Sequence, residues 1–196
     1  MKTTKLMAGL ALVASTLLTT APVLAQDQNP TKDSTASLTI EAGERNIDSV
    51  PELNFKVKLS GNITASSLSS DQTNPIKLSD YTGSLSGWTL NVKRSAFADT
   101  TNSSTTLDGF KLTLTGGSFD PSSDDVTGTT PKGILEIGTA EETVATAAEG
   151  TGTGATTINY TGATLELPET IRKGKVKVGT TYSSTLTWTL TDAPTN

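Results

Sequence analysis

The 196-residue sequence contains no cysteine and no histidine. Without cysteine the chain can form no disulfide, no thiolate metal site and no thiol nucleophile. Without histidine it lacks the commonest general base, the usual zinc ligand and the Ser-His-Asp triad. These two absences disfavour most catalytic and cofactor chemistry before any motif is considered.

Basic and aromatic residues are also scarce. Fifteen Lys and Arg stand against 20 Asp and Glu, which gives a formal net charge of −5, and only nine residues are Phe, Trp or Tyr. Phosphate binding needs Lys and Arg concentrated on one surface, and the sequence has no basic cluster, so we expect no nucleic-acid partner. Hydroxyl residues, by contrast, are abundant, with 38 Thr and 20 Ser.

The first 25 residues have the pattern of a secretory signal peptide. Lys2 and Lys5 form a charged start, residues 7–18 are apolar, and residues 23–25 read Val-Leu-Ala, a small-x-small cleavage site. The apolar stretch is too short for a membrane-spanning helix. We therefore predict a signal peptide over residues 1–25 and a secreted chain that is stabilised by packing alone.

Residues 26–37 are polar and are predicted to be a flexible lead-in to one domain over residues 38–196. In that domain apolar and polar residues alternate, which is typical of strands with one buried face. The alternating apolar residues are Leu38/Ile40, Phe55/Val57/Leu59, Trp88/Leu90/Val92, Phe110/Leu112/Leu114, Leu135/Ile137, Ile158/Tyr160, Leu165/Leu167, Val176/Val178 and Leu186/Trp188/Leu190. We predict an all-β fold of about ten short strands, a β-sandwich or Greek-key-like domain.

One stretch of the domain, residues 138–157, lacks this alternation. Its first part, AEETVATAAE, favours a helix, and its second part, GTGTGATT, is rich in glycine. We predict one long flexible surface loop here, with room for one short helix.

Pairs of acidic residues are the remaining candidates for chemistry. Asp124-Asp125 and Glu141-Glu142 lie in Gly-, Ser- and Thr-rich segments, whereas a glycosidase holds two carboxylates across a cleft that usually contains aromatic platforms. Asp120, with Asp124 and Asp125, supplies oxygen ligands for calcium, but their spacing is not that of an EF-hand. We favour solvated loop residues in both places, and we expect no catalytic residue, no metal site and no cofactor.

Residues 167–170 read Leu-Pro-Glu-Thr, the L-P-x-T part of a sortase signal for covalent wall attachment. The next residue is Ile171 instead of Gly, and no apolar run long enough to hold in a membrane follows it. The segment is therefore predicted to be a strand end followed by a turn. Retention at a surface is then expected to be non-covalent.

The two tryptophans share a sequence context. Trp88-Thr89-Leu90 and Trp188-Thr189-Leu190 lie one hundred positions apart, and in a strand the Trp and Leu of each motif point to the same face. The rings are either core anchors or an aromatic platform for a ligand. We favour core anchors, more firmly for Trp188, because Gly87 beside Trp88 leaves room for a ligand or another backbone.

These paired motifs and the segments around them resemble the WxL domain family, secreted surface proteins of Gram-positive bacteria. The similar segments are Ser37–Phe55, Tyr81–Phe97, Gly109–Gly117 and Tyr182–Pro194. The resemblance implies a short family member, a signal peptide plus a WxL domain, that attaches non-covalently to the cell wall with peptidoglycan as its target. It also implies protein partners: a membrane-anchored WxL-interacting protein and other WxL proteins.

Three functions follow from these observations, and they belong to different classes. We predict a cell-wall-binding module at the cell surface. The alternative is a structural or adhesive subunit of a surface complex that acts mainly through protein partners. A wall or glycan hydrolase is the third and least favoured function, because the chain lacks the usual catalytic residues.

Overall fold

The computed structural model describes residues 30–57, 67–69, 74–173, 176 and 179–193. The predicted signal peptide and its cleavage site lie outside these ranges. The chain divides into two compact units, Met1–Thr39 and Ile40–Asn196. In the first unit the described residues 30–39 form neither helix nor strand and are exposed.

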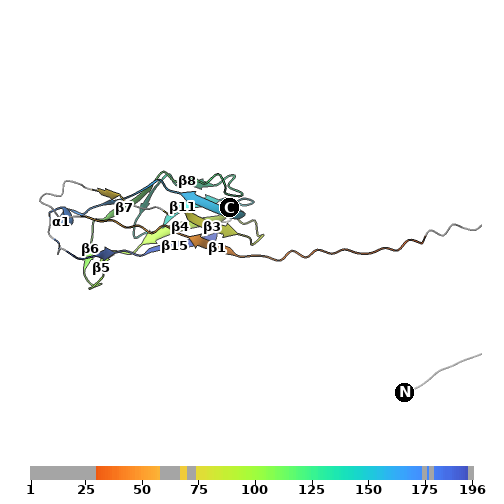
Figure 1. The fold of residues 1–196 in the computed structure, drawn as a ribbon, viewed down its shortest axis with the longest axis horizontal. Coiled ribbons are helices and arrows are strands. Elements are labelled where there is room, and N and C mark those ends of the chain that lie inside the picture. The colour runs from red at the N-terminus through yellow and green to blue at the C-terminus, as the bar shows by residue number, and fades with distance from the viewer. Residues whose placement is uncertain (1–29, 58–66, 70–73, 174–175, 177–178, 194–196) are drawn as a thin grey trace, which may run out of the picture. The chain divides into compact units, whose positions relative to one another are not determined.

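The second unit consists of antiparallel sheets, which we call A to D, with strands given in their spatial order (Figure 1). Sheet A contains β1 (Arg45–Ser49), β3 (Ile76–Asp80), β12 (Gly154–Asn159) and β8 (Ser118–Phe119). Sheet B contains β10 (Ile134–Ile137), β7 (Lys111–Thr115), β13 (Gly162–Glu166) and β2 (Ser67–Ser69). Sheet C contains β15 (Leu186–Asp192), β4 (Trp88–Arg94), β11 (Glu142–Ala147) and β9 (Thr130–Pro131). Sheet D contains β14 (Tyr182–Ser183), β5 (Phe97–Asp99) and β6 (Thr106–Leu107).

The one helix among the described residues is α1 (Glu169–Arg172), a single turn. None of the helical structure described is long and apolar enough to cross a membrane. The prediction of an all-β fold is therefore confirmed.

One hydrophobic core takes side chains from sheets A, B and C. Because side chains alternate across a strand, every second residue of a strand faces this core. The core residues that are 2% exposed or less include Ile76, Leu78, Trp88, Leu90, Val92, Leu112, Leu114, Leu135, Ile137 and Ile158. Most of these are residues that the alternating pattern predicted to be buried.

The prediction of a flexible loop over residues 138–157 is wrong. The segment contains β11, an interior strand of sheet C between β4 and β9, and the first part of β12. Val144, Ala145 and Ala147 of β11 are each 1% exposed. The pairing register shifts between Thr143 and Ala145, so the period-two pattern is interrupted, and alanine carries only a weak apolar signal.

In three of the predicted strands, none of the residues that the structure describes belongs to a strand. Leu38 and Ile40 are 85% and 86% exposed and belong to no strand. Phe55 and Val57 lie in an irregular segment, and Val176 lies in a bend. Leu59 and Val178 lie outside the described residues. Alternation alone does not make a strand where no neighbouring strand supplies backbone partners.

The Leu-Pro-Glu-Thr segment follows β13 directly. Leu167 is 3% exposed, and the Pro168 carbonyl accepts hydrogen bonds from the backbone N–H groups of Ile171 at 3.0 Å and Arg172 at 3.2 Å. The segment is thus a strand end followed by a helical turn, as predicted.

Candidate functional site

The two W-x-L motifs lie side by side in sheet C, on the neighbouring strands β4 and β15 (Figure 1). The strands are antiparallel and pair over seven residues each, with Leu90 directly opposite Leu190. Trp88 pairs with Asp192 and Trp188 pairs with Val92. The motifs that are remote in sequence therefore form one continuous patch of the sheet.

The Trp and Leu of both motifs point to the core side of the sheet. Trp88 and Leu90 are 1% and 0% exposed, whereas Trp188 and Leu190 are partly buried against the same core. This order of burial is opposite to our expectation, which placed Trp188 more firmly in the core. The reason is topological, since β4 has a strand on each side and β15 is at the edge of the sheet.

The Trp88 ring is held by the turn between β11 and β12. Its indole Nε1 donates a hydrogen bond to the Gly152 carbonyl at 2.9 Å. Gly152 has a φ of +78°, and a Cβ there would lie 2.5 Å from that indole nitrogen and 2.4 Å from the Ala147 Cβ. A Cβ on Gly87, whose φ is +66°, would lie 2.3 Å from the Ala147 carbonyl oxygen. The close approach that Gly87 permits is therefore that of another backbone.

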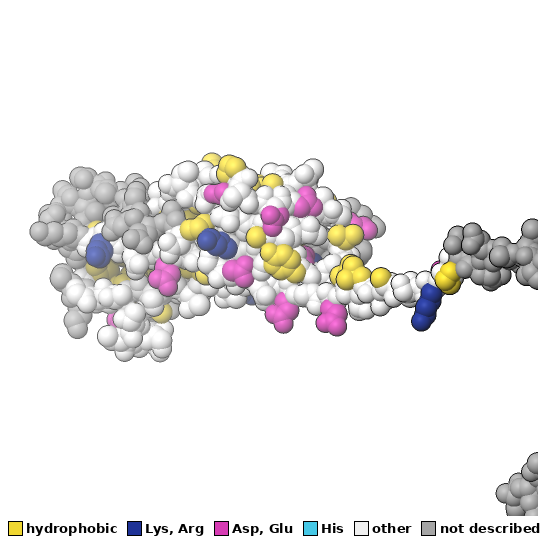
Figure 2. Space-filling model, turned by 45° about the vertical axis from the view of Figure 1, so that its right-hand side comes forward, with side chains coloured by type: hydrophobic (Ala, Val, Ile, Leu, Met, Phe, Trp, Pro, Cys, Tyr) yellow, Lys and Arg dark blue, Asp and Glu magenta, His cyan; other side chains and the backbone are white. Residues whose placement is uncertain are grey.

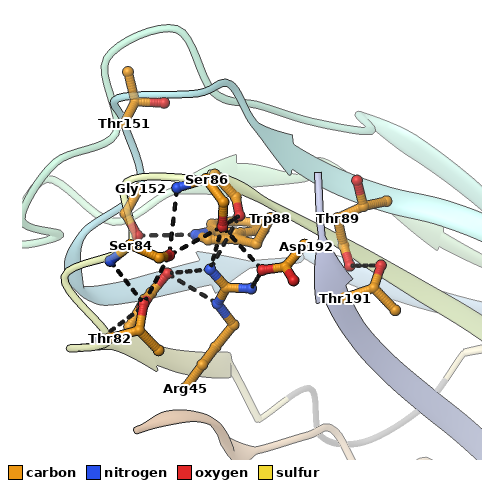
Figure 3. A network of polar contacts seen from close by, with 12 residues as sticks. Arg45, Thr82, Ser84, Ser86, Trp88, Thr89, Thr151, Gly152, Thr191 and Asp192 are labelled. Atoms are coloured by element: carbon orange, nitrogen blue, oxygen red, sulfur yellow. Dashed lines mark hydrogen bonds and ion pairs between the residues drawn. The ribbon is translucent and has the colours of Figure 1, made fainter. Parts of the chain in front are cut away.

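A partly buried arginine joins sheet A to the start of β4 and the end of β15 (Figure 3). The Arg45 side chain, 11% exposed, contacts the Asp80 carboxylate at 2.8 Å and pairs with Asp192. The same guanidinium donates to the Ser86 hydroxyl and to the Gly87 carbonyl oxygen, each at 3.1 Å. Arg45 therefore clamps both W-x-L strands to β1 and β3.

Three hydroxyl side chains of the segment between β3 and β4 link the Asp80 carboxylate to the Asp192 carboxylate by hydrogen bonds. Thr82 donates to Asp80 at 2.7 Å, and the Ser84 hydroxyl lies 3.0 Å from the hydroxyls of both Thr82 and Ser86. The Ser86 hydroxyl donates to Asp192 at 2.9 Å. Both ends of the segment that precedes β4 are thereby fixed by side-chain hydrogen bonds.

These contacts shift the pKa values of all three charged groups. Burial alone would raise the pKa of Asp80, but hydrogen bonds from Thr82 and the contact with Arg45 outweigh it and lower the pKa. The hydrogen bond from Arg45, and next the one from Ser86, lower the pKa of Asp192. Burial works to lower the pKa of Arg45, but its hydrogen bonds to Asp192 and Asp80 outweigh this and raise it. All three groups are therefore held in their charged forms.

Sequence reasoning did not find this clamp. Arg45 and Asp192 are 147 positions apart, and neither lies in a motif. The one local signal is the run of alternating hydroxyl residues Thr82, Ser84 and Ser86 after Asp80, which is typical of side-chain-stabilised turns.

The outward face of sheet C carries the middle residue of each motif. Thr191 lies opposite Thr89, and Thr189 lies opposite Asn91. Figure 3 shows Thr89 and Thr191 close together, where the Thr191 hydroxyl donates a hydrogen bond to the Thr89 backbone carbonyl at 3.5 Å. The outward residues of the paired rows are Thr130, Thr143, Thr146, Thr89, Asn91, Lys93, Thr187, Thr189 and Thr191. We call this set the threonine face.

The acidic candidates do not come together. Asp120 accepts hydrogen bonds from Ser122 and Asn159, the carboxylate of Asp124 accepts one from the Ala155 backbone, and Glu142 pairs with Lys132 at 2.9 Å. Within the described ranges no three acidic residues gather as a metal site would require. Figure 2 shows acidic side chains spread over one face of the molecule.

A hollow of about 450 Å³ lies near α1 and β14, apart from the motifs. Phe97, Phe110 and Tyr182 contribute to its lining together with the hydroxyl residues at 180, 181, 183 and 184. Of the residues in β4 and β15, only Leu186 reaches it. The W-x-L motifs therefore build a packed sheet and do not line this hollow.

Comparison with known proteins identifies the family of this chain. Searches among curated proteins and among solved structures gave no match. A family model described as "WxL domain surface cell wall-binding" matches residues 3–194, which include both W-x-L motifs, the Arg45 clamp and the threonine face. The resemblance to the WxL domain family is thus confirmed, and with it the expected location at the cell surface and cell wall. This chain belongs to the WxL domain family of surface, cell wall-binding domains.

Proposed function

We propose that this protein is exported and attaches non-covalently to the Gram-positive cell wall by binding peptidoglycan directly. The observation that carries the proposal is the match of a cell-wall-binding family model to residues 3–194. The signal-peptide pattern of residues 1–25 supports export. A 7-residue β15 next to a 7-residue β4 gives the domain a broad sheet face on which many weak polar contacts can add up.

In this proposal the motif residues have a structural role. Trp88, Leu90, Trp188 and Leu190 hold β4 and β15 on the core, and Thr89 and Thr189 lie on the other face. The protein binds and does not catalyse, in agreement with a family of wall-binding domains. Zymography with the purified chain on embedded cell walls tests this, and a cleared zone would show that a hydrolytic activity exists.

Sedimentation with purified Gram-positive peptidoglycan tests direct binding. The purified chain is expected in the pellet with wall sacculi and in the supernatant without them. A chain that stays in the supernatant at every sacculus concentration would show that direct wall binding is wrong.

A role through protein partners is the second candidate, and the edge strand β15 favours it. Sheet C ends at β15, and among the described residues no strand pairs with its outer edge. An open edge can accept a strand from another chain. A membrane-anchored WxL-interacting protein and other WxL proteins are the proposed partners. Capture of such a protein from membranes, without affinity for bare wall, would make this the primary role.

A further inference from the structure

We propose that the threonine face is the surface that contacts the wall, and that its ligand is the glycan strand of peptidoglycan. This inference rests on the proposed function and names the contact surface within it. The Trp88 and Leu90 side chains are 1% and 0% exposed, so they cannot supply the contact. The residue between them, and its counterpart in the second motif, lie on the opposite face of the sheet.

The threonines of this face form rows across the strands. Thr130, Thr146, Thr89 and Thr191 are paired successively across β9, β11, β4 and β15. Neighbouring strands lie about 4.8 Å apart, and same-face residues along a strand repeat about every 7 Å. The outward polar side chains of β4 and β15 therefore repeat along and across the strands, which suits an extended polymer whose own hydroxyl groups repeat, and the register shift between Thr143 and Ala145 interrupts this repeat on β11.

Three of the four threonines in this row are accessible. Thr130, Thr146 and Thr191 are exposed, whereas the Thr89 hydroxyl between them is buried. The Thr143 hydroxyl donates to the Asn91 side-chain carbonyl at 2.9 Å, which orients that amide. A ligand on this face thus meets hydroxyl groups on both sides of Thr89 and a fixed amide in the next row.

The charge of the face fits the wall. Lys93 is the single charged residue of the set, and none is acidic, although the chain contains 20 Asp and Glu. The corresponding face of sheet B carries Lys111, Glu136 and Glu166, with a 2.7 Å ion pair between the first two. A face without carboxylates does not repel the carboxylates on the peptide stems that flank a glycan strand.

The chemistry of the face favours a sugar chain over a protein partner. Protein interfaces rely on aromatic, Met or aliphatic anchors in their buried centres. The threonine face has no such residue, and its polar groups are hydroxyls, one amide and one ammonium. These are groups that pair with sugar hydroxyl and acetamido groups, each contact being weak and the sum appreciable.

Matched substitutions on two faces test this inference. The first variant is Thr146→Val/Thr189→Val/Thr191→Val on the threonine face, and the control is Thr113→Val/Thr115→Val/Thr164→Val on the outward face of sheet B. Valine keeps the branched shape that suits strands, so both variants should keep the fold. Urea midpoints check that both variants are folded. If the triple variant on the threonine face is unstable, the single substitution Thr191→Glu at the sheet edge replaces it in the binding measurement.

The measurement is sedimentation of the purified chain with peptidoglycan sacculi at two salt concentrations. We expect affinity to fall at least about tenfold in the threonine-face variant, since three hydrogen bonds are lost, and to be unchanged in the control. Glycan strands stripped of their peptides by an amidase should compete, and added salt should change binding little because Lys93 is the single charged group of the face.

The outcomes separate this inference from the function on which it rests. If the parent chain does not sediment, direct wall binding fails and the inference fails with it. If the parent sediments and the threonine-face variant binds within twofold of it, the inference alone is wrong. Competition by stem peptides but not by stripped glycan would likewise overturn it, as would a steep loss of binding with salt, which indicates an anionic wall polymer.

Discussion

Trp88 and Trp188 point to the same side of sheet C but lie at opposite ends of the Leu90–Leu190 pair. Trp88 pairs with Asp192 and Trp188 with Val92, so the rings are four residues, about 13 Å, apart along the strands. The indoles therefore do not stack into one aromatic platform. Each anchors a different end of the two-strand patch to the core.

The two tryptophans should differ in what their loss costs. Trp88→Ala should lower the free energy of unfolding by about 3–5 kcal/mol, because a fully buried ring leaves a cavity. Trp188→Ala should cost about 1–3 kcal/mol, because its ring is only partly buried. Urea midpoints measure both losses of stability. Tyr81→Ala is the control, because the Tyr81 side chain is 58% exposed. An equal or reversed order would contradict the assignment of β15 as an edge strand.

The turn over Trp88 should not tolerate a side chain. In Gly152→Ala the new Cβ meets the indole nitrogen and Ala147, so we expect a loss of more than about 2 kcal/mol. Gly150→Ala is the matched control, since its φ is +81° and nothing lies within 4 Å of a Cβ there. That control should cost only the backbone strain of about 1 kcal/mol. Similar losses in both variants would mean that the Trp88 contact is unimportant.

The Arg45 clamp should make stability fall in acid. Asp80 and Asp192 have lowered pKa values in the folded chain, so their contribution is complete above the unfolded value near 3.8. It is lost as the pH falls through the lower folded values. Asp80→Asn should cost about 2 kcal/mol or more at pH 7, because it leaves a partly buried guanidinium less well paired.

Urea midpoints at pH 7, 5 and 3 check the pH dependence. The Asp80→Asn variant should show a flatter profile between pH 5 and pH 3 than the parent chain. Asp192→Asn is the comparison, since Asp192 is 73% exposed and its removal should change the profile less. A profile that is the same in parent and Asp80→Asn would show that the clamp does not govern acid stability.

Residues 142–157 should be essential for folding. Replacing them with a Gly-Ser linker removes β11 from the interior of sheet C together with the buried Val144 and Ala147. The variant is expected to lose its cooperative unfolding transition, followed by far-ultraviolet circular dichroism. A cooperative transition near the parent midpoint would mean that the segment is a loop after all.

A buried threonine in sheet A offers a stabilising substitution. Thr156 is 1% exposed, and its hydroxyl has no hydrogen-bond partner among the described residues. Thr156→Val keeps the shape and removes an unpaired polar group, so stability should rise by about 1 kcal/mol. Thr157→Val, on the outward face of the same strand, is the control and should change little. A clear loss in Thr156→Val would show that the hydroxyl is paired.

The sequence by itself determined those features that depend on residues close to one another along the chain. Alternation identified β4, β7, β10 and β15 and the all-β class, because the two faces of a strand differ in burial whichever strand lies beside it. The two Trp-Thr-Leu motifs, with the segments around them, identified the family. The Leu-Pro-Glu-Thr segment was recognised as a strand end from the residues that follow it.

What only the tertiary structure decided depends on partners far along the chain. β11 is a strand because β4 and β9 flank it, although its alanines and its irregular register give little local signal. Leu38 and Ile40 alternate perfectly yet form no strand, because no strand among the described residues pairs with them. The pairing of Leu90 with Leu190, and of Arg45 with Asp192, is set by the register of strands that meet only in the folded chain. That register is also what turns scattered threonines into one face.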